Sequence, residues 1–222
     1  MKKERSFRVF VIYALLFQFA ILMSQNKMIE SSTAVTVKNY NARDATVQVL
    51  VSFAEIGDES SSMVAYTGTG TIIADVDSNV YVLTARHVCT PSSAATAFMY
   101  GMEPKVEIQD VDGAFHDAEI SLISRTDDLC IVKYEPPSHE YRQVASISPS
   151  PPTIDATVYM YAAPAGFYVP SAIAQFTGTF SGNAYVFNES SGVYTMPATG
   201  GSSGAAVVNH NGEIIGVLHS TL

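Results

Sequence analysis

Three short segments place a histidine, an aspartate and a serine where they could act together. His87 follows the β-branched run Val80–Thr84 after only a few residues. Its imidazole is therefore expected at the end of a strand, facing a cleft. Asp128 directly precedes apolar sequence, and a carboxylate buried there needs a partner such as a histidine N–H. The neighbouring Asp127 is expected on the opposite face, because strand residues alternate.

The serine is Ser203, in the segment Thr199–Gly204. A serine hydroxyl is a poor nucleophile until a base takes its proton, and the developing oxyanion needs fixed donors. The flanking glycines predict that the N–H groups of Gly201 and Ser203 converge on one spot. Taken alone, His87 could be an ordinary polar loop histidine, Asp128 a solvated turn residue, and residues 199–204 a flexible Gly/Ser loop. Their order, with intervals of 41 and 75 residues, favours joint action.

These segments resemble the chymotrypsin-like serine proteases across roughly residues 46–222. Residues 84–87 are similar to that family's Thr-Ala-x-His segment, residues 128–132 to its Asp strand, and residues 201–204 to its Gly-x-Ser-Gly loop. Residues 68–73 resemble the Gly-x-Gly strand of Deg-type and glutamyl endopeptidase members. The resemblance implies acyl transfer on polypeptide substrates by His87, Asp128 and Ser203, with no metal or organic cofactor.

The chain departs from the family at three places. Ser202 replaces the aspartate that many relatives pair with a freed amino terminus, so activation by such an insertion is not expected. Ala205-Ala206 replaces the usual Gly-Pro or Ser-Pro. Relatives have another strand after the one at residues 213–219, so the second barrel is expected to be incomplete, as in a fragment or a polyprotein product.

In this family, the specificity pocket is built from residues just before the nucleophile and just after the last hairpin. The resemblance therefore implies a pocket formed by Pro197, Ala198, Thr199, His219, Ser220 and Thr221. The resemblance places Pro197 where trypsin-like specificity needs an aspartate, which argues against a Lys or Arg preference. Residues 199–204 and 214–220 resemble those of glutamyl endopeptidases and several positive-strand RNA virus proteases, in which a pocket histidine recognises Glu or Gln. The resemblance makes a Glu or Gln preference one expectation. His219 lies one residue further from Gly216 than the pocket histidine of those proteases, which reverses its face on a strand.

Cys89 and Cys130 each lie two residues beyond a predicted catalytic residue. Folding that joins His87 to Asp128 would bring the two cysteines close. A disulfide is one outcome in an oxidising compartment. Two separate buried thiols are the favoured alternative, because proximity does not guarantee bridging geometry.

The predicted fold is all-β, with two six-stranded antiparallel barrels and one hydrophobic helix before them. Short β-branched runs suggest a first barrel at residues 46–136, a proline-rich connection at 137–154 and a second barrel at 155–222, with no helix in either barrel. Residues 25–45 read as a polar tether.

Residues 1–24 contain an apolar run, Val9–Met23, behind a basic start. They are expected to be a signal-anchor, or a signal peptide if cleaved. The basic flank would stay cytoplasmic, so the protease domain is expected to be extracytoplasmic on a membrane, or secreted. The first 30 residues carry a net charge of +3 and the remainder −12, which argues against nucleic acid as a partner. The sequence leaves the oligomeric state open.

Two other functions remain open: a catalytically silent protease fold that binds a partner, and a membrane-anchored adhesion domain. The second leaves the ordered motifs unexplained. A virus-encoded processing protease and an exported bacterial or phage protease are both compatible with these features.

Overall fold

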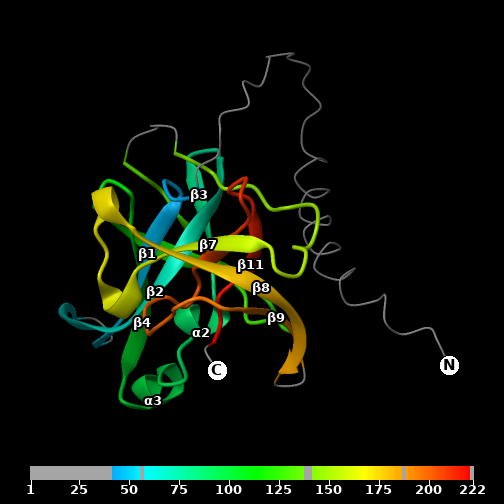
Figure 1. Cartoon of the computed structure of the whole chain (residues 1–222). Helices are drawn as coiled ribbons and strands as arrows, with labels where there is room; N and C mark the ends of the chain where they lie inside the picture. The colour runs from blue at the N-terminus through cyan, green and yellow to red at the C-terminus, as the bar shows by residue number, and fades with distance from the viewer. Residues whose placement is uncertain (1–41, 56–57, 138–141, 187–188, 221–222) are drawn as a thin grey trace, which may run out of the picture. The chain divides into compact units, whose positions relative to one another are not determined.

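The computed structural model describes residues 42–55, 58–137, 142–186 and 189–220, which lie in one compact unit. Most of these residues form strands, in two groups separated by the connection at residues 135–156 (Figure 1). The first group contains β1 (Thr46–Glu55), β2 (Asp58–Val76), β3 (Asn79–Thr84), β4 (Met102–Gln109), β5 (Phe115–Ile123) and β6 (Cys130–Tyr134). The second contains β7 (Thr157–Ala162), β8 (Ala174–Val186), β9 (Glu189–Tyr194), β10 (Ala206–Val208) and β11 (Ile214–Val217).

The first group is a closed antiparallel barrel in the order β1-β2-β3-β6-β5-β4. Its interior follows from period-two alternation: on β3, Val80 and Val82 are fully buried, and Tyr81 between them is only partly buried. Val47, Val49 and Val51 of β1 fill the same interior. Burying each such valine contributes about 1.5–3 kcal/mol, so this alternation holds the barrel closed.

Strand β1 is buried on both faces. Thr46 and Gln48 point away from the barrel interior but are only 1% and 4% exposed. The Gln48 side-chain amide donates to the carbonyl of Gly166 at 2.9 Å, and the Tyr168 hydroxyl donates to the carbonyl of Thr46 at 2.9 Å. Both partners lie in the β7–β8 connection, so β1 fixes the second group of strands to the barrel.

The second group is an open, curled five-stranded sheet in the order β11-β10-β7-β8-β9, which agrees with the expectation of an incomplete second barrel. Among the described residues, no strand joins the outer edges of β9 and β11. Strand β8 is continuous through residue 182. Gly182 there has φ +121° at an irregularity in the β8–β9 pairing, which lets the strand bend without ending.

The expectation that the barrels contain no helix was wrong. The structure has two short α-helices, α2 (Arg86–Cys89) and α3 (Ala94–Met99), besides the 3-10 turns η1 (Pro164–Gly166) and η2 (Pro170–Ala172). The one turn of α2 begins where the backbone N–H of His87 finds an acceptor in the Asp128 carboxylate, a partner that local sequence does not reveal. The alanine-rich segment of α3 lies between β3 and β4.

The amino-terminal side of the domain begins earlier than expected. Residues 42–45 form a turn whose Ala42 and Ala45 are buried in the core, and the carbonyl of Ala45 accepts from the N–H of Ile72 at 2.8 Å. The predicted tether therefore does not extend to residue 45. The apolar run at residues 9–23 lies outside the described residues, and no helix among those described is long and apolar enough to cross a membrane.

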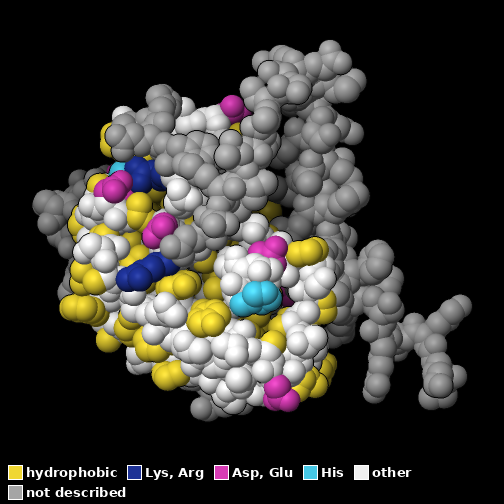
Figure 2. Space-filling model, turned by 45° about the horizontal axis from the view of Figure 1, so that its top comes forward, with side chains coloured by type: hydrophobic (Ala, Val, Ile, Leu, Met, Phe, Trp, Pro, Cys, Tyr) yellow, Lys and Arg dark blue, Asp and Glu magenta, His cyan; other side chains and the backbone are white. Residues whose placement is uncertain are grey.

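On the face in Figure 2, the described Lys and Arg side chains lie apart from one another, with Asp or Glu side chains close to them. On that face, the described basic residues do not form a continuous stripe.

Candidate active site

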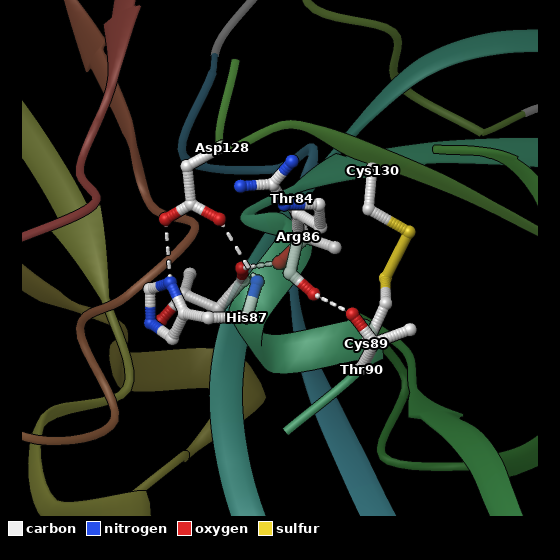
Figure 3. The surroundings of a disulfide bond; sticks show 8 residues. Thr84, Arg86, His87, Cys89, Thr90, Asp128 and Cys130 are labelled. Carbon is white, nitrogen blue, oxygen red and sulfur yellow. Dashed lines mark hydrogen bonds and ion pairs between the residues drawn. A yellow bond between two sulfur atoms is a disulfide. The ribbon is translucent and has the colours of Figure 1, made fainter. Parts of the chain in front are cut away.

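His87 and Asp128 are held together by two hydrogen bonds at the end of the first barrel. The Nδ1 atom of His87 lies 2.6 Å from Oδ2 of Asp128, and the backbone N–H of His87 donates to Oδ1 at 2.9 Å (Figure 3). One carboxylate thus orients the ring and begins helix α2. The His87 side chain remains 45% exposed, so its other ring nitrogen, Nε2, is accessible from outside.

A disulfide joins the residues that follow this pair. Cys89 and Cys130 are bonded across Cα atoms 6.6 Å apart, in place of the two separate thiols that the sequence favoured. Figure 3 shows the bridge beside the His87–Asp128 pair, linking α2 to the start of β6. Helix α2 is therefore attached covalently to the first residue of β6 at Cys89, and by hydrogen bonds from His87 to Asp128 just before that strand.

Asp127 points elsewhere. Its Oδ2 accepts from the hydroxyls of Ser124 at 3.2 Å and Thr126 at 2.7 Å, and so belongs to its own turn. The Arg86 guanidinium donates to the carbonyl of Ser124 at 3.3 Å, which ties α2 to the same turn. Of the two adjacent acids, only Asp128 contacts the histidine in the described hydrogen bonds.

The loop around Ser203 has all four of its consecutive carbonyls, residues 200–203, occupied. Gly200 accepts from the N–H of Ala165, and Ser202 accepts from the N–H of Ala205 at 3.0 Å. The other two are bound by Thr69 of β2: its hydroxyl donates to the Gly201 carbonyl at 2.8 Å, and its N–H donates to the Ser203 carbonyl at 2.8 Å. No carbonyl is left to face the site.

The N–H groups of the loop alternate between bound and free. Ser202 donates to the carbonyl of Thr199 at 3.0 Å and Gly204 to that of Leu218 at 2.7 Å, whereas Gly201 and Ser203 donate to nothing among the described residues. In a trans peptide the C=O and N–H point in opposite directions. Because the carbonyls of residues 200 and 202 are held inward, the free N–H groups point outward, as an oxyanion site requires.

Gly201 can be nothing but glycine here. Its φ is +86°, and a Cβ would meet the Ala163 carbonyl and the N–H groups of Ala165 and Gly166. The loop is therefore packed directly against the turn at residues 163–166, part of which is η1.

The Ser203 loop also packs against the segment that carries His87. A Cβ on Gly68 would lie 2.6 Å from the side chain of Val88 and 3.1 Å from the carbonyl of Ser203, so one glycine separates the two segments. Among the described residues, no hydrogen bond joins the Ser203 hydroxyl to His87. Such bonds are often long until substrate binds.

A cavity of about 350 Å³ is lined in part by Ala198, just before the Ser203 loop, and by residues 217–220, which follow the last hairpin. Of the residues expected to form the specificity pocket, Ala198, His219 and Ser220 line it; Pro197 and Thr199 do not, and Thr221 lies outside the described residues. A second wall, which the sequence did not reveal, comes from β9 and the two residues after it, with Tyr194 at its centre.

Tyr194 spans from one edge of the sheet towards the other. A Cβ on Gly192 or on Gly216 would lie 3.0 Å from the Tyr194 hydroxyl, so both positions must stay small. Burial raises the pKa of Tyr194, which keeps the phenol neutral. Among the described residues that line the cavity there is no Asp, Glu, Lys or Arg, and the titratable groups are His219 and Tyr194.

The described residues contain no cluster of three His, Cys, Asp or Glu side chains that could hold a metal ion. A family model for the trypsin-like peptidase domain matches residues 68–217, most of the chain, and spans His87, Asp128 and Ser203. The chain therefore belongs to the trypsin-like peptidase domain family, with a closed six-stranded barrel and a curled half-barrel of the chymotrypsin type. No curated protein matches it.

Proposed function

We propose that this protein is a serine endopeptidase that uses His87, Asp128 and Ser203 as a catalytic triad. Two features together support the proposal. The Nδ1 atom of His87 lies 2.6 Å from the Asp128 carboxylate. In the Ser203 loop the carbonyls of residues 200–203 are all bound, whereas the N–H groups of Gly201 and Ser203 have no acceptor among the described residues. These two features supply the oriented base and the anion donors that acyl transfer needs.

In the proposed reaction, His87 takes the proton from the Ser203 hydroxyl as its oxygen attacks the scissile carbonyl. Asp128 holds the ring in the tautomer whose Nδ1 carries hydrogen and stabilises the imidazolium. The N–H groups of Gly201 and Ser203 stabilise the oxyanion. His87 then protonates the leaving amine, and water releases the acyl group from Ser203 by the same steps in reverse.

The test is labelling of the full chain by a fluorophosphonate, which reacts only with an activated serine. We expect labelling of the parent, no labelling of Ser203→Ala, and fragment masses that place the adduct on Ser203 and not on Ser202. Asp127→Asn is the matched control for Asp128→Asn, and His210→Ala for His87→Ala. A folded parent that does not react would reject the proposal in favour of a silent binding module.

We also propose a preference for Glu or Gln before the cleaved bond. Support comes from the cavity lining, where His219 can donate a hydrogen bond to a carboxylate or amide oxygen and no acidic group would repel it. Cleavage of a peptide library by the parent and by His219→Ala tests this. Cleavage after large apolar residues, with none after Glu or Gln, would contradict it.

We further propose that residues 1–24 tether the protease at a membrane, with the domain on the extracytoplasmic side, or direct its secretion. The apolar run at residues 9–23 supports this, and so does the Cys89–Cys130 disulfide, because such bonds persist mainly in oxidising compartments. Alkaline extraction of membranes from expressing cells tests it: an anchored chain stays with the lipid, a cleaved chain is recovered outside, and a chain found soluble in the cytoplasm would exclude both.

A further inference from the structure

Thr69 binds the nucleophile loop more extensively than the other described residues do. It lies on β2 and is fully buried. Its N–H donates to the Ser203 carbonyl at 2.8 Å and its hydroxyl donates to the Gly201 carbonyl at 2.8 Å. One residue of the first barrel thus holds two of the four loop carbonyls.

The hydroxyl of Thr69 has a second bond that fixes its direction. Its oxygen accepts the N–H of Ala163 at 2.9 Å, so its own hydrogen is directed to Gly201. The Thr69 carbonyl in turn accepts the hydroxyl of Thr84 at 2.8 Å, three residues before His87. The chain of bonds runs from the histidine segment through Thr69 to the nucleophile loop.

The hydrogen bond from the Thr69 hydroxyl to the Gly201 carbonyl lies between the two proposed oxyanion donors. The Gly201 carbonyl belongs to the one peptide that lies between the two free N–H groups, those of Gly201 and Ser203. The peptides on either side are held by Ala165 and Ala205. The N–H of this middle peptide, that of Ser202, donates to the Thr199 carbonyl within the same loop, and Thr69 holds its carbonyl from outside the loop. Because glycine has the widest freedom of backbone rotation, loss of the Thr69 bond would leave the Gly201 end of this peptide the less restrained one.

We propose that the Thr69 hydroxyl is the positioning group of the oxyanion site, and that it acts on turnover and not on substrate affinity. This inference rests on the proposed function, since it assigns a role within that reaction. Without the hydroxyl, the Gly201 carbonyl and the Ala163 N–H are both buried and lose their hydrogen-bond partner. The peptide between Gly201 and Ser202 then rotates towards a different hydrogen-bond partner. The donors then no longer meet the oxyanion together.

The chain offers a matched control two residues along the same strand. Thr71 is, like Thr69, a buried threonine of β2, with 1% of its surface exposed. Its hydroxyl has no hydrogen-bond partner among the residues that the structure describes. Thr71→Val therefore makes the same chemical change without touching the loop. Thr69→Ser keeps the hydroxyl and removes only a methyl group.

The experiment compares Thr69→Val, Thr69→Ser and Thr71→Val in the full chain, by kcat, KM and the thermal midpoint. We expect Thr69→Val to lower kcat about 100-fold with KM unchanged within twofold, as displaced oxyanion donors do. Thr69→Ser should stay within about fivefold of the parent and Thr71→Val should match it. Equal losses in Thr69→Val and Thr69→Ser, or a Thr69→Val variant that retains kcat, would overturn the inference.

A second measurement does not depend on activity. Amide hydrogen exchange over residues 199–206 should speed up in Thr69→Val and remain as in the parent in Thr69→Ser and Thr71→Val. Unchanged exchange in Thr69→Val overturns the inference, even if the parent proves inactive and the proposed function fails. If Thr69→Val does not fold, Thr69→Ala removes the hydroxyl with less steric change and is read in the same way.

Discussion

Removing the disulfide is the perturbation whose size follows most directly from the structure. Cys89→Ala with Cys130→Ala opens a loop of 41 residues. Loop-closure entropy for that length gives about 4 kcal/mol of lost stability. Both sulfurs are buried and alanine fits without a polar group, so the change adds little beyond the lost cross-link. For a domain of this size the thermal midpoint should fall by about 8–16 °C.

Denaturant unfolding of four samples measures this loss: the parent and the double variant, each with and without reductant. The reduced parent and the double variant should unfold together, well below the oxidised parent. Mass after alkylation of the denatured, unreduced parent checks the bridge itself. A parent that takes up two alkyl groups, or a double variant within about 1 kcal/mol of the oxidised parent, would refute the reasoning.

The same double variant should keep most of its activity where it is folded. The two hydrogen bonds between His87 and Asp128 do not involve the sulfurs. We therefore expect kcat at low temperature to fall less than about tenfold, since the pair keeps its geometry. A larger fall would mean that the bridge, and not the carboxylate, orients the imidazole.

Three further predictions follow from single contacts. Asp128→Asn should lower kcat about 10⁴-fold through the wrong histidine tautomer while Asp127→Asn stays near the parent, as steady-state kinetics will measure; similar losses in both would reject the assignment. Gly204→Ala should prevent folding, seen by circular dichroism, because φ is +86° and a Cβ would overlap the Thr69 carbonyl and the Thr84 hydroxyl; a folded variant would contradict this. Burial raises the pKa of Tyr134, so the stability due to its neutral phenol is present below pH 10 and is lost as pH rises above it. Its hydroxyl has no partner, so Tyr134→Phe should unfold no earlier than the parent at pH 7 and lose less stability by pH 11; an equal alkaline loss would exclude Tyr134 as a cause.

The sequence predicted the parts of the site that depend on short, local patterns. His87, Asp128 and Ser203 each end or precede an apolar run, and their order follows the family. The strands of the first barrel were also predictable, because alternation such as that of Val80 and Val82 is visible in one segment. These features need no knowledge of what lies across the fold.

The rest depends on contacts between distant residues. Helix α2 begins on a carboxylate 41 residues away, and β9 lines the cavity only because the second sheet curls. In the sequence, Thr69 is the middle one of three threonines, with Thr67 and Thr71, that alternate with Gly68 and Gly70, and nothing in this pattern sets it apart from the other two. Only the fold distinguishes a threonine that binds the loop from one that binds nothing.

The loop around Ser203 draws its hydrogen bonds from both halves of the molecule. Thr69 belongs to the first barrel, while Ala165 and Ala205 belong to the second group of strands. A chain in which only one half has formed therefore lacks part of the proposed oxyanion site. The proposed peptide-cleaving activity would need both halves to be formed and docked, so a half-folded chain would be unable to digest itself or its neighbours.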